Sequence, residues 1–300
     1  MTPSPTHTLP PLAAAMLLWG GCATQPADPP DWVAWKVRRI EFLAGTNGWT
    51  TLVGLHWLKE GTNSAGSAAN QDVVLPKGRS APWIGQFIRT GESVQFLAAP
   101  GVQARVDGHP VTQASLVSDR TPPPSRLEVG PLSIIVIERS GRIGLRVRDP
   151  ESPWRKSFTA PHSFPYAPSW RIEGRFEPFA SPRTLRVPSR IGGTQDFPSP
   201  GSLVFSHAGK EYRLEVAVEP GETDYFVMFR DQTAGKTTYG SGRFLYVSPP
   251  DSTGRVILDF NRAYTPPCGF TPFATCPLPP PQNRLPFPIP AGEIAPEEHP

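Results

Sequence analysis

The sequence predicts a mainly β protein with two β-rich lobes, because it combines many short apolar runs with a high density of turn-forming residues. It contains 40 prolines and 27 glycines among 300 residues, and 10% of its residues are aromatic. Proline interrupts helices and glycine supplies tight turns, so this composition argues against a helical bundle. We expect a sandwich-like N-terminal lobe, a C-terminal lobe built as an antiparallel meander or barrel, and one N-terminal helix.

The numbers of acidic and basic residues limit the kinds of molecule that the protein is expected to bind. Lysine and arginine number 29 against 26 acidic residues, which leaves a formal net charge of +3. This balance gives no electrostatic case for binding nucleic acid or an acidic membrane surface. The chain has no HExxH motif and no paired CxxC motif, so we predict neither a metal nor a cofactor.

Residues 1–22 are predicted to be a lipoprotein signal segment. An apolar run at Leu12–Trp19 precedes Gly-Gly-Cys22-Ala, and its eight residues are too few to span a bilayer. We expect an acylated Cys22 followed by a proline-rich tether at 23–30, which would place the protein in the cell envelope, attached to a membrane only through its lipid. No Lys or Arg precedes the run and Trp19 replaces the usual Leu, so a cytoplasmic protein is the alternative.

Residues 31–150 are predicted to form a helix followed by the first β lobe. Apolar residues recur at helical spacing over Asp31–Ala44, and Asp31 is placed to cap this helix. After Thr50 the pattern changes to short strands, at Thr51–Leu58, Asp72–Leu75, Trp83–Ile88, Val94–Leu97, Ala104–Val106, Leu127–Val129, Ile134–Glu138 and Gly144–Val147. The stretch from Val106 to Val136 is loosely similar to the later strands of forkhead-associated domains, and no phosphothreonine-binding function is carried over from that likeness.

Residues 151–293 are predicted to form the second β lobe, and residues 294–300 a flexible tail. Glu151–Phe179 is rich in proline and aromatic residues, which indicates an ordered crossover held by aromatic packing, or alternatively a surface that binds sugars or aromatic groups. Antiparallel strands are expected at Thr184–Val187, Gly201–Ser206, Glu211–Ala217, Tyr225–Arg230, Lys236–Val247 and Val256–Phe260. Gly235-Lys-Thr is similar to the end of a phosphate-binding loop, but Arg230 stands where the first glycine would be, so we interpret it as a hairpin loop.

Four segments near the C-terminus resemble one family, the domain of unknown function 1684 family. They are FRDQTAGKTTYGSGRFL, LDFNRAYTPPC, CPLPPPQNRL and the closing AGE. The sequence departs from the family pattern at Thr265, where Asn is usual, at Gly269, where Ala is usual, and at Ile294, where Lys is usual. The resemblance covers Arg148–Glu293 best and implies a fold, but it implies no reaction.

Seven polar residues of this block are candidates for a ligand site. Alternation along two strands joined by Pro249–Gly254 would put Arg243 opposite Asp259 or one step from it. One interpretation is an ion pair that fixes the strand register. The other is a pocket for an anionic or carbonyl group. The seven residues are Asp231, Tyr239, Arg243, Asp259, Asn261, Tyr264 and Asn283.

We therefore expect the C-terminal lobe to bind a small polar or anionic ligand. One alternative is a hydrolase or transferase that uses Arg243, Asp259, Asn261 and Tyr264, with Asp231 and Asp259 as an acid pair. Another is a structural or interaction protein of the envelope. In an oxidising compartment the default for the two remaining cysteines, Cys268 and Cys276, is a disulfide.

Overall fold

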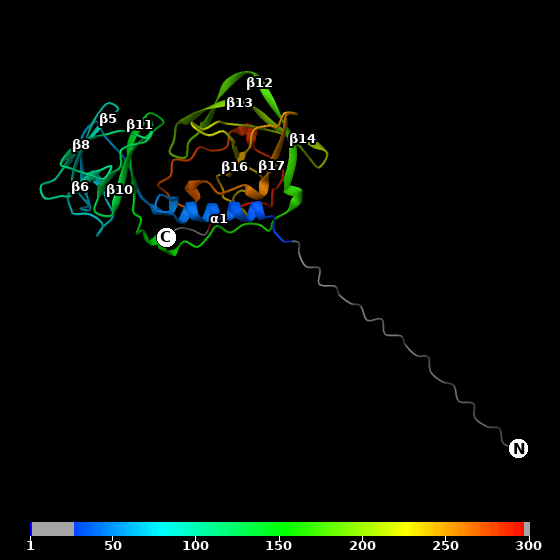
Figure 1. The fold of residues 1–300 in the computed structure, drawn as a ribbon, viewed down its shortest axis with the longest axis horizontal. Helices are drawn as coiled ribbons and strands as arrows, with labels where there is room; N and C mark the ends of the chain where they lie inside the picture. The colour runs from blue at the N-terminus through cyan, green and yellow to red at the C-terminus, as the bar shows by residue number, and fades with distance from the viewer. Residues whose placement is uncertain (2–26, 297–300) are drawn as a thin grey trace.

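The computed structural model describes residue 1 and residues 27–296, and it is mainly β with one long helix near the N-terminus (Figure 1). The predicted fold class is therefore confirmed. Cys22, the signal segment after residue 1, the first half of the tether and the end of the tail lie outside the described residues. Among the residues that are described, no helix has the length and apolar character needed to cross a membrane.

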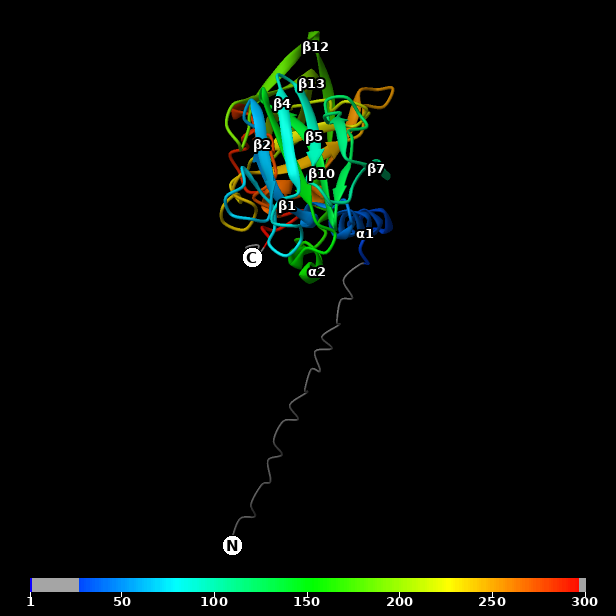
Figure 2. The same cartoon turned by 90° about the vertical axis from the view of Figure 1, so that its left-hand side faces the viewer.

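The first lobe is a β sandwich with its own core (Figure 2). One sheet has the order β1-β11-β10-β9-β6-β7, formed by Leu52–Trp57, Arg142–Arg148, Leu132–Arg139, Leu127–Val129, Ala104–Val106 and His109–Val111. The other has the order β3-β2-β4-β5-β8, formed by Val73–Val74, Gly61–Gly66, Gly85–Thr90, Ser93–Ala98 and Gln113–Leu116. Phe87 and Phe96 of the second sheet pack with Ile134 and Leu145 of the first, and all four are fully buried.

Strand β11 has two different faces. Ile143, Leu145 and Val147 point into the sandwich core, so the alternation of side chains places Arg146 and Arg148 on the opposite face. Arg146 is nevertheless only 6% exposed, because the second lobe covers this face and its Thr275 accepts a hydrogen bond from Arg146 Nη2 at 3.2 Å. This face of β11 therefore forms part of the contact between the lobes.

The second lobe combines a four-stranded sheet with a two-stranded one. The order β14-β13-β12-β17 joins Lys210–Glu215, Thr194–His207, Arg171–Pro188 and Arg255–Asp259, and β15 (Tyr225–Phe229) pairs with β16 (Arg243–Val247). Strand β12 begins inside the passage that we predicted to be a crossover. The strand predicted for Lys236–Val247 is shorter than expected, because its first part, including Gly235-Lys-Thr, forms a loop.

The long helix α1 (Pro30–Ala44), predicted together with the first lobe, lies along the second lobe (Figure 1). Trp32 Nε1 donates to the Asn261 carbonyl at 3.0 Å, and Arg39 pairs with Glu293 at 2.8 Å. The prediction that Asp31 caps the helix is wrong. The helix already begins at Pro30, so Asp31 lies in its first turn, where its carboxylate pairs with Arg262.

Candidate functional site: a cleft between the lobes

The predicted pairing of Arg243 with Asp259 is wrong, because the strands that carry them do not pair with each other. Arg243 on β16 lies opposite Phe229 of β15, and Asp259 on β17 lies opposite Arg171 of β12. The connection at Pro249–Gly254 carries the chain from one sheet to the other instead of closing a hairpin. Two of the seven candidate residues are thereby assigned to different sheets.

Arg243 instead forms a buried ion pair with another candidate residue, Asp231. Arg243 Nη2 donates to Asp231 Oδ2 at 2.5 Å, and both side chains are 1% exposed. The guanidinium also donates to the carbonyls of Ile289, at 2.9 Å, and Ala291. Burial lowers the pKa of Arg243, and the attraction of Asp231 opposes that shift. The pair thus joins β16 to the loop after β15 and to the C-terminal segment within the core.

Asp259 and Asn261 make contacts that fix loops. Asn261 Oδ1 accepts from the Ala167 N–H at 2.9 Å, while Asn261 Nδ2 donates to the Ala167 carbonyl at 3.0 Å and to Asp259 Oδ1 at 2.9 Å. Asp259 accepts a hydrogen bond from Asn261, and Asp231 accepts one from Arg243. The use of the two carboxyls as an acid pair stays a prediction.

Asn283 has the same kind of contacts. Its side chain is fully buried, and its amide accepts from the Glu215 N–H at 2.8 Å and donates to the carbonyls of Glu215, at 2.8 Å, and Met228, at 2.9 Å. Asn283 therefore ties β14 to β15. Side chains whose hydrogen-bonding capacity is used in this way act as braces.

Tyr239 lies beside the two cysteines. Its hydroxyl donates to the Cys268 carbonyl at 2.8 Å, and burial raises the pKa of Tyr239 to about 12. The Cys268 N–H donates to Cys276 Sγ at 3.1 Å, so the cysteines are neighbours, and both are buried free thiols in this structure. The disulfide stays a prediction.

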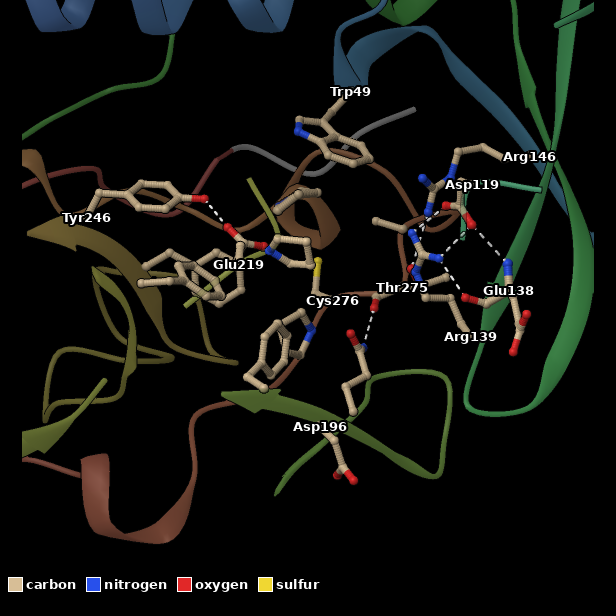
Figure 3. A pocket seen from close by; sticks show the side chains of 18 of the residues that line it. Trp49, Asp119, Glu138, Arg139, Arg146, Asp196, Glu219, Tyr246, Thr275 and Cys276 are labelled. Atoms are coloured by element: carbon tan, nitrogen blue, oxygen red, sulfur yellow. Dashed lines mark hydrogen bonds and ion pairs between the residues drawn. The ribbon is translucent and has the colours of Figure 1, made fainter. Parts of the chain in front are cut away.

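The described part of the chain has a cleft of about 1400 Å³ where the two lobes and α1 meet (Figure 3). Among the seven candidates, only Tyr264 lines it. Helix α1 supplies Trp35, Arg38, Arg39 and Phe42, while the first lobe supplies Trp49, Asp119, Arg120, Glu138, Arg139 and Arg146. The second lobe supplies Phe197, Glu219, Phe226, Phe244, Tyr246, Tyr264, Thr275 and Cys276.

Arg146 is the notable group on the first-lobe wall. Within the described residues its guanidinium makes no ion pair, and its buried Nε has no hydrogen-bond partner. Burial lowers its pKa to about 10, with smaller contributions from the positive charges of Arg139 and Arg148. The nearby Asp119 carboxylate is already held by both terminal nitrogens of Arg139, at 3.0 and 2.7 Å. Among the described residues, Arg146 is thus a buried cation that lines the cleft without an ion pair of its own.

Glu219 and Tyr246 lie on the opposite wall (Figure 3). The Tyr246 hydroxyl donates to Glu219 Oε2, and Glu219 makes no ion pair within the described residues. Burial raises the pKa of Glu219, while the hydrogen bond from Tyr246 opposes that shift. Tyr246 also stacks on Tyr264, with ring centroids 6.0 Å apart.

Sequence reasoning missed Arg146, Glu219 and Tyr246. The detectable signal was at Arg146 and Arg148, two arginines that alternate with the apolar residues of a core strand. That pattern shows that they lie on the face of the sheet opposite the sandwich core, but it does not show that another lobe covers this face. Glu219 gave no signal, because its environment depends on contacts between segments far apart in the chain.

We expect Glu219→Gln to stabilise the protein at neutral pH and to have no effect in acid. A carboxyl whose pKa is raised by folding costs stability when it is ionised, above its folded-state pKa. That cost disappears as the pH falls through the folded pKa towards the ordinary value of 4.5. Urea unfolding of both proteins across this pH range checks it. Equal stability at every pH would show that folding does not shift the Glu219 pKa.

The described residues contain no group of three or more His, Cys, Asp or Glu side chains that could hold a metal ion. The fold and the cleft thus define the class of protein. It is a mainly β protein with a charged and aromatic cleft between two lobes. The chain belongs to the DUF1684 family, a family of proteins of unknown function. The model of this family matches residues 156–294. The resemblance found in the sequence is therefore confirmed.

Three solved structures are similar to parts of the chain. An uncharacterised protein of Haloarcula marismortui, solved by NMR, is 30% identical, and the match covers 49% of this chain and 83% of that one with a TM-score of 0.42. The FhaA FHA domain and a second FHA domain are 16% and 17% identical, with TM-scores of 0.24 and 0.23. Each FHA match covers 33% of this chain and 96% of the other. No curated protein matches the chain.

Proposed function

We propose that the protein binds a small organic anion in the cleft between its lobes, with Arg146 as the group that receives the anionic end. The observation that carries this proposal is the buried guanidinium of Arg146, which has no ion-pair partner among the described residues and whose Nε has no hydrogen-bond partner there. A charge taken out of water is costly unless a partner neutralises it. A bound anion would supply that partner, and arginine suits carboxylates and phosphates because its planar fork donates two parallel hydrogen bonds.

The size and lining of the cleft support a small-molecule ligand. Sites for such ligands are concave and mostly apolar, with a few fixed polar groups that orient the ligand. This cleft has aromatic side chains on the second-lobe wall and a buried cation on the first-lobe wall. The proposal keeps the predicted small polar or anionic ligand and adds the first lobe to its site. The hydrogen bonds of Asn261 favour a bracing role over a part in the alternative hydrolase or transferase centre.

Replacing Arg146 with methionine is expected to abolish ligand binding without lowering the melting temperature. Removing a buried charge that lacks a counter-charge should leave stability unchanged or raise it by about 1 kcal/mol. Thermal-shift measurements against monocarboxylates, sulfonates and phosphate monoesters would identify ligands for the wild type, and Arg146→Met should respond to none of them.

Arg142→Met is the matched control, because Arg142 lies on the same strand and is exposed. It should keep the wild-type response. If Arg146→Met responds to anions as the wild type does, or if no anion of these classes stabilises the wild type, the proposed function is wrong.

We also propose that the protein works in the cell envelope, tethered through an acylated Cys22. The apolar run and Gly-Gly-Cys22 of the sequence support this. Cys22→Ser should release the protein from the membrane fraction or leave an uncleaved precursor, as measured by fractionation and intact mass. A wild-type chain that is found in the cytoplasm with Met1 intact would contradict the anchor.

A further inference from the structure

We propose further that the ligand of the cleft is zwitterionic, with its ammonium group at Glu219 and its acidic group at Arg146. This inference rests on the proposed anion site and names the class of molecule that the site accepts. It follows from which charges of the cleft are paired, from the aromatic cluster that includes Tyr246, the hydrogen-bonding partner of Glu219, and from the apolar side chains of the lining.

Most charges that line the cleft already have partners. Arg139 holds Asp119, Arg120 lies 2.7 Å from Glu138, and Arg39 lies 2.8 Å from Glu293. Asp196 is held by Arg186 at 2.9 Å. Arg38 is exposed on α1, where water can solvate it. Within the described residues, this leaves Arg146 and Glu219 as shielded lining charges without a partner of opposite sign.

Arg146 and Glu219 lie on different walls, one on each lobe, and Figure 3 shows them on opposite sides of the pocket. A ligand with a single negative charge would satisfy Arg146 and leave Glu219 without a cationic partner. A ligand with one charge of each sign, separated by a spacer, would satisfy both walls. Electrostatic complementarity of this kind chiefly provides specificity.

The aromatic cluster that includes Tyr246, the hydrogen-bonding partner of Glu219, suits an ammonium group. Phe226, Phe244, Tyr246 and Tyr264 form a ring of neighbours, with centroid distances of 4.8 Å for the two phenylalanines, 5.9 Å for Phe244 and Tyr264, 6.0 Å for the two tyrosines and 5.3 Å for Tyr246 and Phe226. Aromatic faces attract cations, and a carboxylate beside them adds a direct counter-charge. Arg39 lies over Tyr264 at 4.5 Å, so this cluster already accommodates one cation.

The lining of the cleft also includes apolar side chains. Phe197, Ala274 and Pro277 line it together with Cys276. An aliphatic or aromatic spacer would bury its surface against these side chains, and the burial of apolar surface favours binding. The chemistry therefore fits an ω-amino acid, in which a carboxylate and an ammonium group stand at the two ends of an apolar chain.

Isothermal titration calorimetry with three matched series tests the inference: ω-amino acids of increasing chain length, the monocarboxylates of the same lengths and the monoamines of the same lengths. We expect the wild type to prefer one length of ω-amino acid over its monocarboxylate by about tenfold, which corresponds to about 1.4 kcal/mol. Glu219→Gln should remove that preference and leave the affinity for the monocarboxylate unchanged. Arg146→Met should lose both the ω-amino acid and the monocarboxylate.

Glu222→Gln serves as the control, because Glu222 is an exposed acid in the same loop, and it should behave as the wild type does. Equal affinity of the wild type for an ω-amino acid and its monocarboxylate would overturn the zwitterion and leave the anion site standing. A preference that survives Glu219→Gln would also overturn it. If the wild type binds no member of the three series, the zwitterion is again wrong, and the thermal-shift screen then decides the anion site by itself.

Discussion

Replacing Arg243 with methionine is expected to lower the free energy of unfolding by about 3 to 5 kcal/mol, the cost of breaking a buried ion pair from one side. Asp231 would keep its charge in a site where its side chain is 1% exposed, with only the N–H and hydroxyl of Thr233 left as donors. The carbonyls of Ile289 and Ala291 would also lose their donor. Urea unfolding of the wild type and the variant measures the difference.

Two further variants show whether the loss of stability comes from the Asp231 charge that is left buried without its partner. Arg243→Met combined with Asp231→Asn removes both charges, so it should be more stable than Arg243→Met alone. Arg175→Met removes an arginine that pairs with Glu177 and Glu211 on the surface, and it should cost less than about 1 kcal/mol. A cost for Arg243→Met as small as that for Arg175→Met would contradict the structural role assigned to the buried pair.

Asn283→Ala is expected to destabilise the protein by about 3 kcal/mol, because it removes three side-chain hydrogen bonds from a fully buried position. Each buried donor or acceptor that loses its partner costs about 1 to 3 kcal/mol. The groups affected are the N–H and carbonyl of Glu215 and the carbonyl of Met228, so the contact between β14 and β15 should loosen.

The neighbouring Gln282→Ala is the matched control for Asn283→Ala. Gln282 is exposed, and its side chain makes one hydrogen bond, to Glu215 Oε2 at 2.8 Å. Its loss should cost below about 1 kcal/mol. Hydrogen exchange of the β14 and β15 amides provides a second measurement: Asn283→Ala should speed it and Gln282→Ala should not. Equal unfolding free energies for the two variants would show that Asn283 is not a brace.

The sequence predicted those parts of the fold that local patterns specify. Helical spacing located α1 to within one residue of each end, and alternating apolar residues located strands such as β5 and β10. Strand β2 was missed because Gly61–Gly66 contains no large apolar side chain and owes its place to pairing with β4. Asp31 was misassigned as a cap because Pro30 already occupies the first position of the helix, where proline is well accommodated.

The site was harder to predict for the same physical reason. Arg243 forms an ion pair, but its partner is Asp231, twelve residues earlier, and not Asp259. The prediction assumed a hairpin across Pro249–Gly254, whereas β16 pairs with the preceding β15. Arg146 and Glu219 come from different lobes, and they line one cleft only when the lobes are assembled. No local pattern in either segment encodes that contact.

The Nε–H resonance of Arg146 in ¹⁵N-labelled protein tests the central claim most directly, because this nitrogen is buried and has no hydrogen-bond partner within the described residues. Its loss in the spectrum of Arg146→Met assigns the resonance. On titration with an anion found by the thermal-shift screen, we expect this resonance to shift until it saturates, while that of the exposed Arg142 stays in place. Saturable binding of the anion with the Arg146 resonance unmoved would contradict the claim that Arg146 receives the ligand.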